Sequence, residues 1–193
     1  MANTNNNPSN KVTFESTPNP ATYKFLFHRQ VTEEALDCPT AQEAERSPLA
    51  AKLFGFPWTS SVFIGQDFLT VTKQDWVDWN MLAEPLTGLI QEHLDKGEPV
   101  VHKAQTAQEV SAEGFTNDTP LVKQIKNLLD VEIRPVVALD GGDIIFNRYE
   151  NNILYIHMRG ACAGCPSSTA TLKEGIEVRM KEAFPEIHEV VAI

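Results

Sequence analysis

The sequence is poor in cysteine, in clustered basic residues and in long apolar runs. Only three cysteines occur in 193 residues, so an even disulfide framework cannot form. The net charge is -10 and no block of Lys and Arg is present, which disfavours nucleic acid and anionic membranes as partners. No apolar run approaches the roughly 18 to 20 residues that cross a bilayer. These absences predict no nucleic-acid partner and no membrane partner.

The first residues also lack targeting features. Residues 1–11 are rich in Asn and contain neither the apolar core of a secretory signal nor the Arg of a transit peptide. A reducing compartment would keep cysteines available for metal or redox chemistry. The sequence therefore predicts a cytoplasmic protein whose residues 1–10 are a disordered N-terminus.

Strand-forming and helix-forming patterns alternate over residues 11–96. The expected strands are residues 12–14 and 23–27, which would pair with each other, and residues 62–64 and 68–72, which would form a hairpin. The expected helices are residues 47–54 and 84–94. Ser47 can cap the first helix, Pro48 suits its first turn, and Pro85 is expected at the start of the second. The mixture predicts an α+β domain.

A second α+β domain is expected over residues 120–193, after a linker over residues 97–119 with few large apolar residues. The expected elements are a helix from Pro120 that Pro135 kinks or ends, a hairpin of residues 144–149 and 153–158, a helix around Ile176, and a last strand at residues 190–193. The chain is thus predicted to contain two small α+β domains joined by a flexible linker.

Cys162 and Cys165 form a C-x-x-C pair between the expected hairpin and the helix that follows it. Iron-sulfur clusters are normally held by four thiolates, and structural zinc by four ligands. The pair supplies half of such a site, so a second copy of the chain or a client protein is expected to supply the rest. The N-H groups at a helix start favour anions, which predicts lowered pKa values for these thiols.

Other candidate residues are better explained by structure than by chemistry. Cys38 lies in a polar, acidic stretch and is interpreted as an incidental thiol rather than a ligand. His157 is expected on a strand face. Asp140 and Asp143 flank a Gly-Gly turn and are expected to form local hydrogen bonds rather than a catalytic pair.

Several motifs extend beyond the cysteine pair. In the second domain they are Ile133-Arg-Pro135, Asp140-Gly-Gly-Asp-Ile144, Met158-Arg-Gly-Ala-Cys-Ala-Gly-Cys-Pro-Ser-Ser168 and Thr171-Leu-Lys-Glu-Gly-Ile-Glu177. In the first they are Thr17-Pro-Asn-Pro20, Lys24-Phe25, Ser47-Pro-Leu-Ala50 and Phe63-Ile-Gly-Gln-Asp-Phe-Leu-Thr-Val-Thr-Lys73. By these motifs the chain resembles the Nfu family of iron-sulfur scaffolds and carriers, with an Nfu N-terminal domain over residues 11–96 and a NifU-like C-terminal domain over residues 120–193.

The resemblance implies that Cys162 and Cys165 bind an iron-sulfur cluster, usually 4Fe-4S, shared between the two subunits of a homodimer. The cluster would come from an upstream donor and pass to client apo-proteins, so the protein would be a carrier and not an enzyme. Reasoning from the residues leaves two alternatives open. One is a dithiol-disulfide oxidoreductase in which Cys162 attacks and Cys165 resolves, and the other is a zinc-stabilised adaptor.

Overall fold

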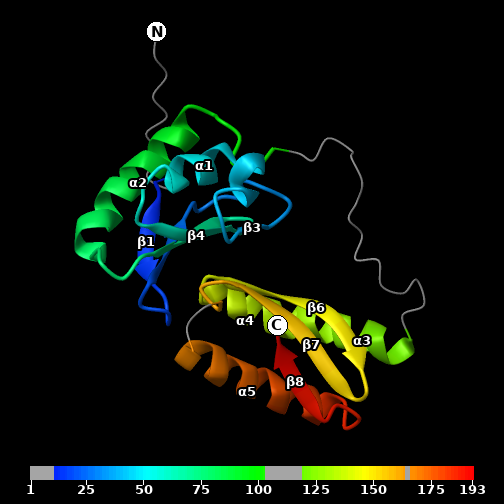
Figure 1. The fold of residues 1–193 in the computed structure, drawn as a ribbon. Helices are drawn as coiled ribbons and strands as arrows, with labels where there is room; N and C mark the ends of the chain where they lie inside the picture. Colours follow the sequence, from blue (N-terminus) through cyan, green and yellow to red (C-terminus); the bar gives the residue numbers. More distant parts are fainter. Residues whose placement is uncertain (1–10, 103–118, 164–165) are drawn as a thin grey trace. The chain divides into compact units, whose positions relative to one another are not determined.

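The computed structural model describes residues 11–102, 119–163 and 166–193, and the chain divides into two compact units, Met1–Lys103 and Ala104–Ile193 (Figure 1). Each unit combines helices and strands around its own apolar core, which confirms the α+β prediction. The predicted disordered start and most of the predicted linker lie outside the described residues. Within the described ranges, no helix combines the length and the apolar character that a membrane crossing requires.

The first unit is a five-stranded antiparallel sheet with helices on one face (Figure 1). In sheet order its strands are β1 (Thr13–Ser16), β2 (Thr22–Leu26), β5 (Phe68–Lys73), β4 (Thr59–Ile64) and β3 (Leu36–Cys38), and its helices are η2 (Glu43–Arg46), α1 (Pro48–Phe54) and α2 (Trp79–Asp95). Phe25 and Leu69 from the sheet share a core with Leu53 and Ile90 from the helices. The predicted pairing of β1 with β2 and the β4–β5 hairpin are confirmed.

Helix α2 begins earlier than the sequence predicts. The helix starts at Trp79, where the Asp78 carboxylate accepts a hydrogen bond from the Asn80 N-H at 2.8 Å, and Pro85 lies inside it. Proline has no N-H to donate to the carbonyl four residues earlier, here that of Met81. Met81 and Pro85 are both exposed, so water can bond to that carbonyl in place of the missing N-H.

Ser47 joins the start of α1 to the chain that follows α2. Its hydroxyl is fully buried, accepts a hydrogen bond from the Ala50 N-H at 2.9 Å and donates one to the Val100 carbonyl at 2.6 Å. The predicted cap is therefore confirmed, and a second bond is added to it. The second bond matters because a buried carbonyl that loses its donor keeps the full cost of its desolvation.

We expect Ser47→Ala to lower the free energy of unfolding of the first unit by about 2 kcal/mol, the sum of a lost cap and an unpaired buried carbonyl. Chemical denaturation followed by Trp fluorescence measures this loss. Asp78→Ala removes an exposed cap with no second bond, and its expected cost is about 1 kcal/mol. Equal costs for the two variants would contradict the role given to the Val100 bond.

The second unit is a three-stranded sheet packed against helices. Its strands are β6 (Gly142–Glu150), β7 (Ile153–Gly160) and β8 (Glu189–Ala192), and its helical segments are α3 (Pro120–Leu128), η3 (Leu129–Ile133), α4 (Arg134–Leu139) and α5 (Pro166–Ala183). The predicted hairpin is β6 and β7, and the predicted last strand is β8, which runs parallel to β7. Ile144 and Ile156 of the sheet share a core with Ile125 and Met180 of the helices.

Pro135 does not end the helical segment. Helix α3 continues through the π-helical turn η3 into α4, and Pro135 occupies the first turn of α4. The wider π turn just before Pro135 accommodates a residue that cannot donate a backbone hydrogen bond. Of the two predicted outcomes, a kink or an end, the end is therefore wrong, because the helical segment changes type and runs on as far as Leu139.

Candidate functional site

Cys162 lies between β7 and α5, at the end of the hairpin that the sequence predicts. Its side chain belongs to the core of the second unit, and only 4% of the residue is exposed. Cys165, its predicted partner, lies outside the described residues. Of the two cysteines in the loop, the structure therefore describes only Cys162, whose thiol is buried in the second unit.

The cysteine loop and the Asp140-Gly-Gly-Asp143 turn form one local structure. The Ala161 N-H donates to the Gly141 carbonyl at 3.1 Å, and the Ala163 N-H donates to the Gly160 carbonyl at 3.1 Å. Gly141 and Gly160 have positive φ angles of 81° and 64°, which glycine adopts without steric cost. Two motifs far apart in sequence are thus joined around Cys162.

The pKa of the Cys162 thiol is raised, and the predicted lowering is wrong for this residue. Burial raises it to about 12, and the negative charges of Asp140 and Asp143 act in the same direction. The prediction used only the favourable field of a helix start, whereas the sulfur is packed among apolar side chains of the core. Desolvation of the thiolate exceeds the helix effect here.

Asp143 is held by Arg134 rather than by the turn itself. The guanidinium donates to both carboxylate oxygens, from Nε at 2.7 Å and from Nη2 at 3.1 Å, and a third donor reaches Asp130 at 3.0 Å. These contacts raise the pKa of Arg134 above its ordinary value, chiefly through the hydrogen bond with Asp143. The expectation of local hydrogen bonds misses this partner of Asp143, which comes from α4.

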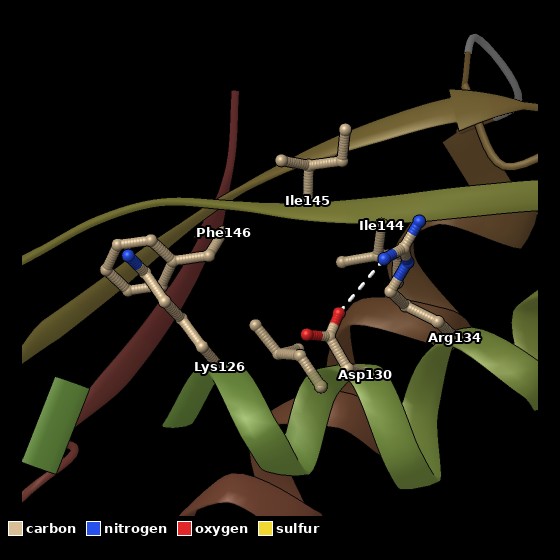
Figure 2. Close-up of a pocket in the computed structure, with 7 residues that line it drawn as sticks. Lys126, Asp130, Arg134, Ile144, Ile145 and Phe146 are labelled. Carbon is tan, nitrogen blue, oxygen red and sulfur yellow. Dashed lines mark hydrogen bonds and ion pairs between the residues drawn. The ribbon is translucent and has the colours of Figure 1, made fainter. Parts of the chain in front are cut away.

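A shallow pocket of about 250 Å³ lies between this ion-pair network and β6. Figure 2 shows Lys126, Asp130 and Arg134 on the helical segment facing the strand, with Ile145 on the strand's far side. The charged groups of the pocket already have partners. The Lys126 Nζ lies 4.9 Å from the centre of the Phe146 ring, and Asp130 forms an ion pair with Arg134. Because these three charged side chains already have partners, none of them is a free group for binding a ligand in the pocket.

The remaining candidates fit structural roles. Cys38 is fully buried in the core of the first unit, and burial raises the pKa of its thiol to about 12. His157 lies on β7, where its Nδ1 is 3.1 Å from the Ile193 carbonyl oxygen and its Nε2 is 3.0 Å from Asn147 Nδ2. In the part of the chain that the structure describes, no group of three or more His, Cys, Asp or Glu side chains is placed to hold a metal ion.

Two residues of the second unit escape sequence reasoning. Gly142 contacts the thiol directly, and Arg134 fixes the carboxylate next to that glycine. Both belong to motifs that carry the family resemblance, but their contacts join residues distant in sequence, and no local pattern identifies such pairs.

Comparison with known protein families gives two matches. Residues 12–97 match the family model described as "Scaffold protein Nfu/NifU N terminal", and residues 125–191 match the "NifU-like domain". A solution NMR structure of a NifU-like protein from Saccharomyces cerevisiae is 27% identical and covers 53% of this chain and 93% of that one, with a TM-score of 0.44.

Curated relatives match most of the chain. A human protein named "NFU1 iron-sulfur cluster scaffold homolog, mitochondrial" is 40% identical over 178 residues, which are 91% of this chain and 69% of that protein. Its namesake in Drosophila willistoni is 36% identical, and the chain spans 61% of its length. Both names contradict the predicted cytoplasmic location and point to mitochondria. That prediction relied on the composition of residues 1–11, which is a weaker guide than similarity over most of the chain.

Proposed function

Because the chain belongs to the Nfu family of iron-sulfur cluster scaffold proteins, we propose that it holds a 4Fe-4S cluster between two copies of itself and delivers it to client apo-proteins. Cys162 and Cys165 are the proposed ligands. The cluster is cargo, received from an upstream donor and passed on. The observation that carries the proposal is the position of Cys162, at the junction of a hairpin and a helix inside the matched NifU-like segment.

The number of available thiols supports sharing between two copies. A 4Fe-4S cluster normally takes four thiolates, and the chain has three cysteines. Cys38 lies in the core of the first unit, outside the NifU-like segment that contains the other two cysteines, so it is not a proposed ligand. One chain therefore offers two proposed thiolates. A second copy related by two-fold symmetry adds the same two and completes the set.

The names of the curated relatives favour a carrier over the oxidoreductase alternative. They are called iron-sulfur cluster scaffolds, and a scaffold holds a cluster rather than turning over a disulfide. We therefore propose a carrier without catalytic activity, in which thiolates of the client replace Cys162 and Cys165 one at a time. The first unit, whose single cysteine is Cys38, would select or position clients.

Anaerobic reconstitution with iron and sulfide tests the proposal. We expect about four iron and four sulfide per dimer on gel filtration, with a broad visible absorbance that an apo-protein client removes. Zinc in place of iron would support the adaptor instead. A colourless monomer that rapidly turns over a model disulfide would support the oxidoreductase.

Exposed apolar residues near the cysteine loop provide a candidate contact between the two copies. Val136 and Leu139 on α4 are 58% and 72% exposed, and Leu139 lies three positions before Gly142, which touches Cys162. We expect Leu139→Asp to raise the dissociation constant of the reconstituted dimer at least about tenfold, since two symmetric copies of the apolar contact are lost. Sedimentation velocity under anaerobic conditions measures it.

Val178→Asp is the matched control for this prediction. Val178 is 59% exposed in the same unit, but it lies twelve residues, about 18 Å, along α5 from Pro166, where the cysteine loop ends. We expect this variant to dimerise like the parent protein. Equal weakening by the two variants would show that added charge, and not the position of Leu139, determines the result.

A further inference from the structure

The second unit has no room for a side chain at Gly142. It opens β6 opposite Gly160, the last residue of β7. A Cβ atom built on Gly142 would lie 2.3 Å from the sulfur of Cys162, 2.9 Å from the Arg159 carbonyl oxygen and 3.1 Å from the Cys162 Cβ. Carbon and sulfur in ordinary contact stay more than about 3.5 Å apart. The sulfur therefore occupies the space that a side chain at residue 142 would fill.

The need for glycine at this position comes from space and not from the backbone angle. Gly141 has a φ of 81°, which strains any other residue, whereas Gly142 is not among the residues with positive φ. The φ angle of Gly142 therefore does not exclude a methyl group, and the obstacles are the Cys162 sulfur at 2.3 Å and the Arg159 carbonyl oxygen at 2.9 Å. The clash with Cys162 is thus the main obstacle to a larger residue.

We infer that Gly142 is a positioning residue for Cys162, and that the slot left by its missing side chain holds the thiol inside the fold. This rests on the proposed function for the role of Cys162 as a ligand. A sulfur that is packed against Gly142 and almost fully buried cannot reach a second subunit. Rotation about the Cα–Cβ bond of Cys162 would bring the sulfur out of the slot. The slot therefore shields the thiol from reagents until it turns outward to bind iron.

The clash determines what a methyl group at residue 142 does. The sulfur can leave by rotation, while the Arg159 carbonyl oxygen at 2.9 Å is backbone and gives way only slightly. Gly142→Ala therefore expels the thiol and also displaces the Arg159 carbonyl slightly at the end of the β6–β7 pair. The variant turns a shielded thiol into an accessible one, and a purely structural role for Gly142 does not predict that change.

The test is the rate at which iodoacetamide modifies Cys162 in full-length protein prepared without iron. Cys165→Ser is present in every variant, so the loop contains one thiol, and peptide mapping by mass spectrometry separates it from Cys38. We expect Gly142→Ala to accelerate modification of Cys162 at least about tenfold. In this variant the reagent would reach the sulfur without prior local opening of the fold. An unchanged rate in a folded variant overturns the inference.

Gly175→Ala is the matched control. Gly175 lies on α5 in the same unit, and a Cβ built there meets nothing within 4 Å. We expect its Cys162 to react at the parent rate. An increase equal to that of Gly142→Ala would overturn the inference, because the effect would then not depend on the slot.

A second measurement decides the case if Gly142→Ala does not fold. Cys162→Ala removes the sulfur, so Gly142→Ala should lower Tm less in that background than in the parent. Equal losses of Tm in the two backgrounds overturn the inference. Failure of the proposed function gives a different result: the parent protein would bind no iron, while the modification rates would still depend on Gly142.

Discussion

Cys162→Ala and Cys165→Ala will each leave the reconstituted protein without a retained cluster, with bound iron falling from about four to less than about one per dimer. Each substitution removes two of the four thiolates at once, because a symmetric dimer carries every change twice. Carboxylate or water could replace a single missing ligand, but two replacements would leave the cluster open to solvent and oxygen. Iron and sulfide counts on the gel-filtered protein measure the loss.

The fold will survive these substitutions. Cys162 is small, and removal of its buried sulfur costs about 1 kcal/mol, well below the stability of a typical domain. Circular dichroism and thermal unfolding of the apo-proteins should therefore stay close to those of the parent. Loss of iron together with loss of fold would leave the ligand assignment without support.

Cys38→Ala is the matched control, since it makes the same chemical change at the third cysteine. Cys38 lies in the core of the first unit, where its sulfur donates to the Glu43 carbonyl at 3.5 Å. We expect this variant to retain about four iron per dimer and to lose some stability in the first unit alone. Retention of iron by either loop variant, or its loss from Cys38→Ala, would contradict the assignment of Cys162 and Cys165.

The sequence predicts this site through its local motif and misses most of the structure that surrounds it. A C-x-x-C pair, a capping serine at Ser47 and the β4–β5 hairpin are local patterns, because the interacting residues are only a few positions apart. The contacts of Gly142 with Cys162 and of Arg134 with Asp143 join separate motifs, and only the folded chain brings them together.

The raised pKa of Cys162 likewise depends on contacts between residues that are distant in sequence. A helix start can be read from the sequence, but the burial of the sulfur depends on which strands and helices pack around it. Helix α2 gives a second example, since the start at Trp79 overrides the expected role of Pro85. Trp79 is buried in the core of the first unit, so tertiary packing favours extension of the helix past the proline.

Arg134→Met is expected to lower the free energy of unfolding of the second unit by about 2 to 3 kcal/mol. The Asp143 side chain is only 9% exposed, and Arg134 donates two hydrogen bonds to it. Methionine keeps the length and apolar character of the stem but leaves the carboxylate buried without its cation, which is the costly way to break such a pair. Chemical denaturation followed by circular dichroism measures the loss.

Arg179→Met is the matched control for that loss. The Arg179 side chain is 41% exposed, as is that of Arg134, and it pairs with Glu132 at 2.7 Å. Glu132 is 46% exposed, so water solvates the carboxylate when the arginine is gone, and the expected cost is below about 1 kcal/mol. The comparison keeps the substitution, the unit and the arginine's exposure constant and varies the burial of the partner. Equal costs would contradict the importance of that burial.

Removal of the carboxylate should recover much of what Arg134→Met loses. In Arg134→Met with Asp143→Leu, no buried charge remains without a partner, and an apolar pair can replace an ion pair at little net cost. We therefore expect the double variant to be more stable than Arg134→Met alone, with a coupling energy of about 1 to 2 kcal/mol between the two sites. A double variant that loses the sum of the two single effects would mean that Arg134 stabilises the unit through Asp130 or its stem, and not through the carboxylate next to Gly142.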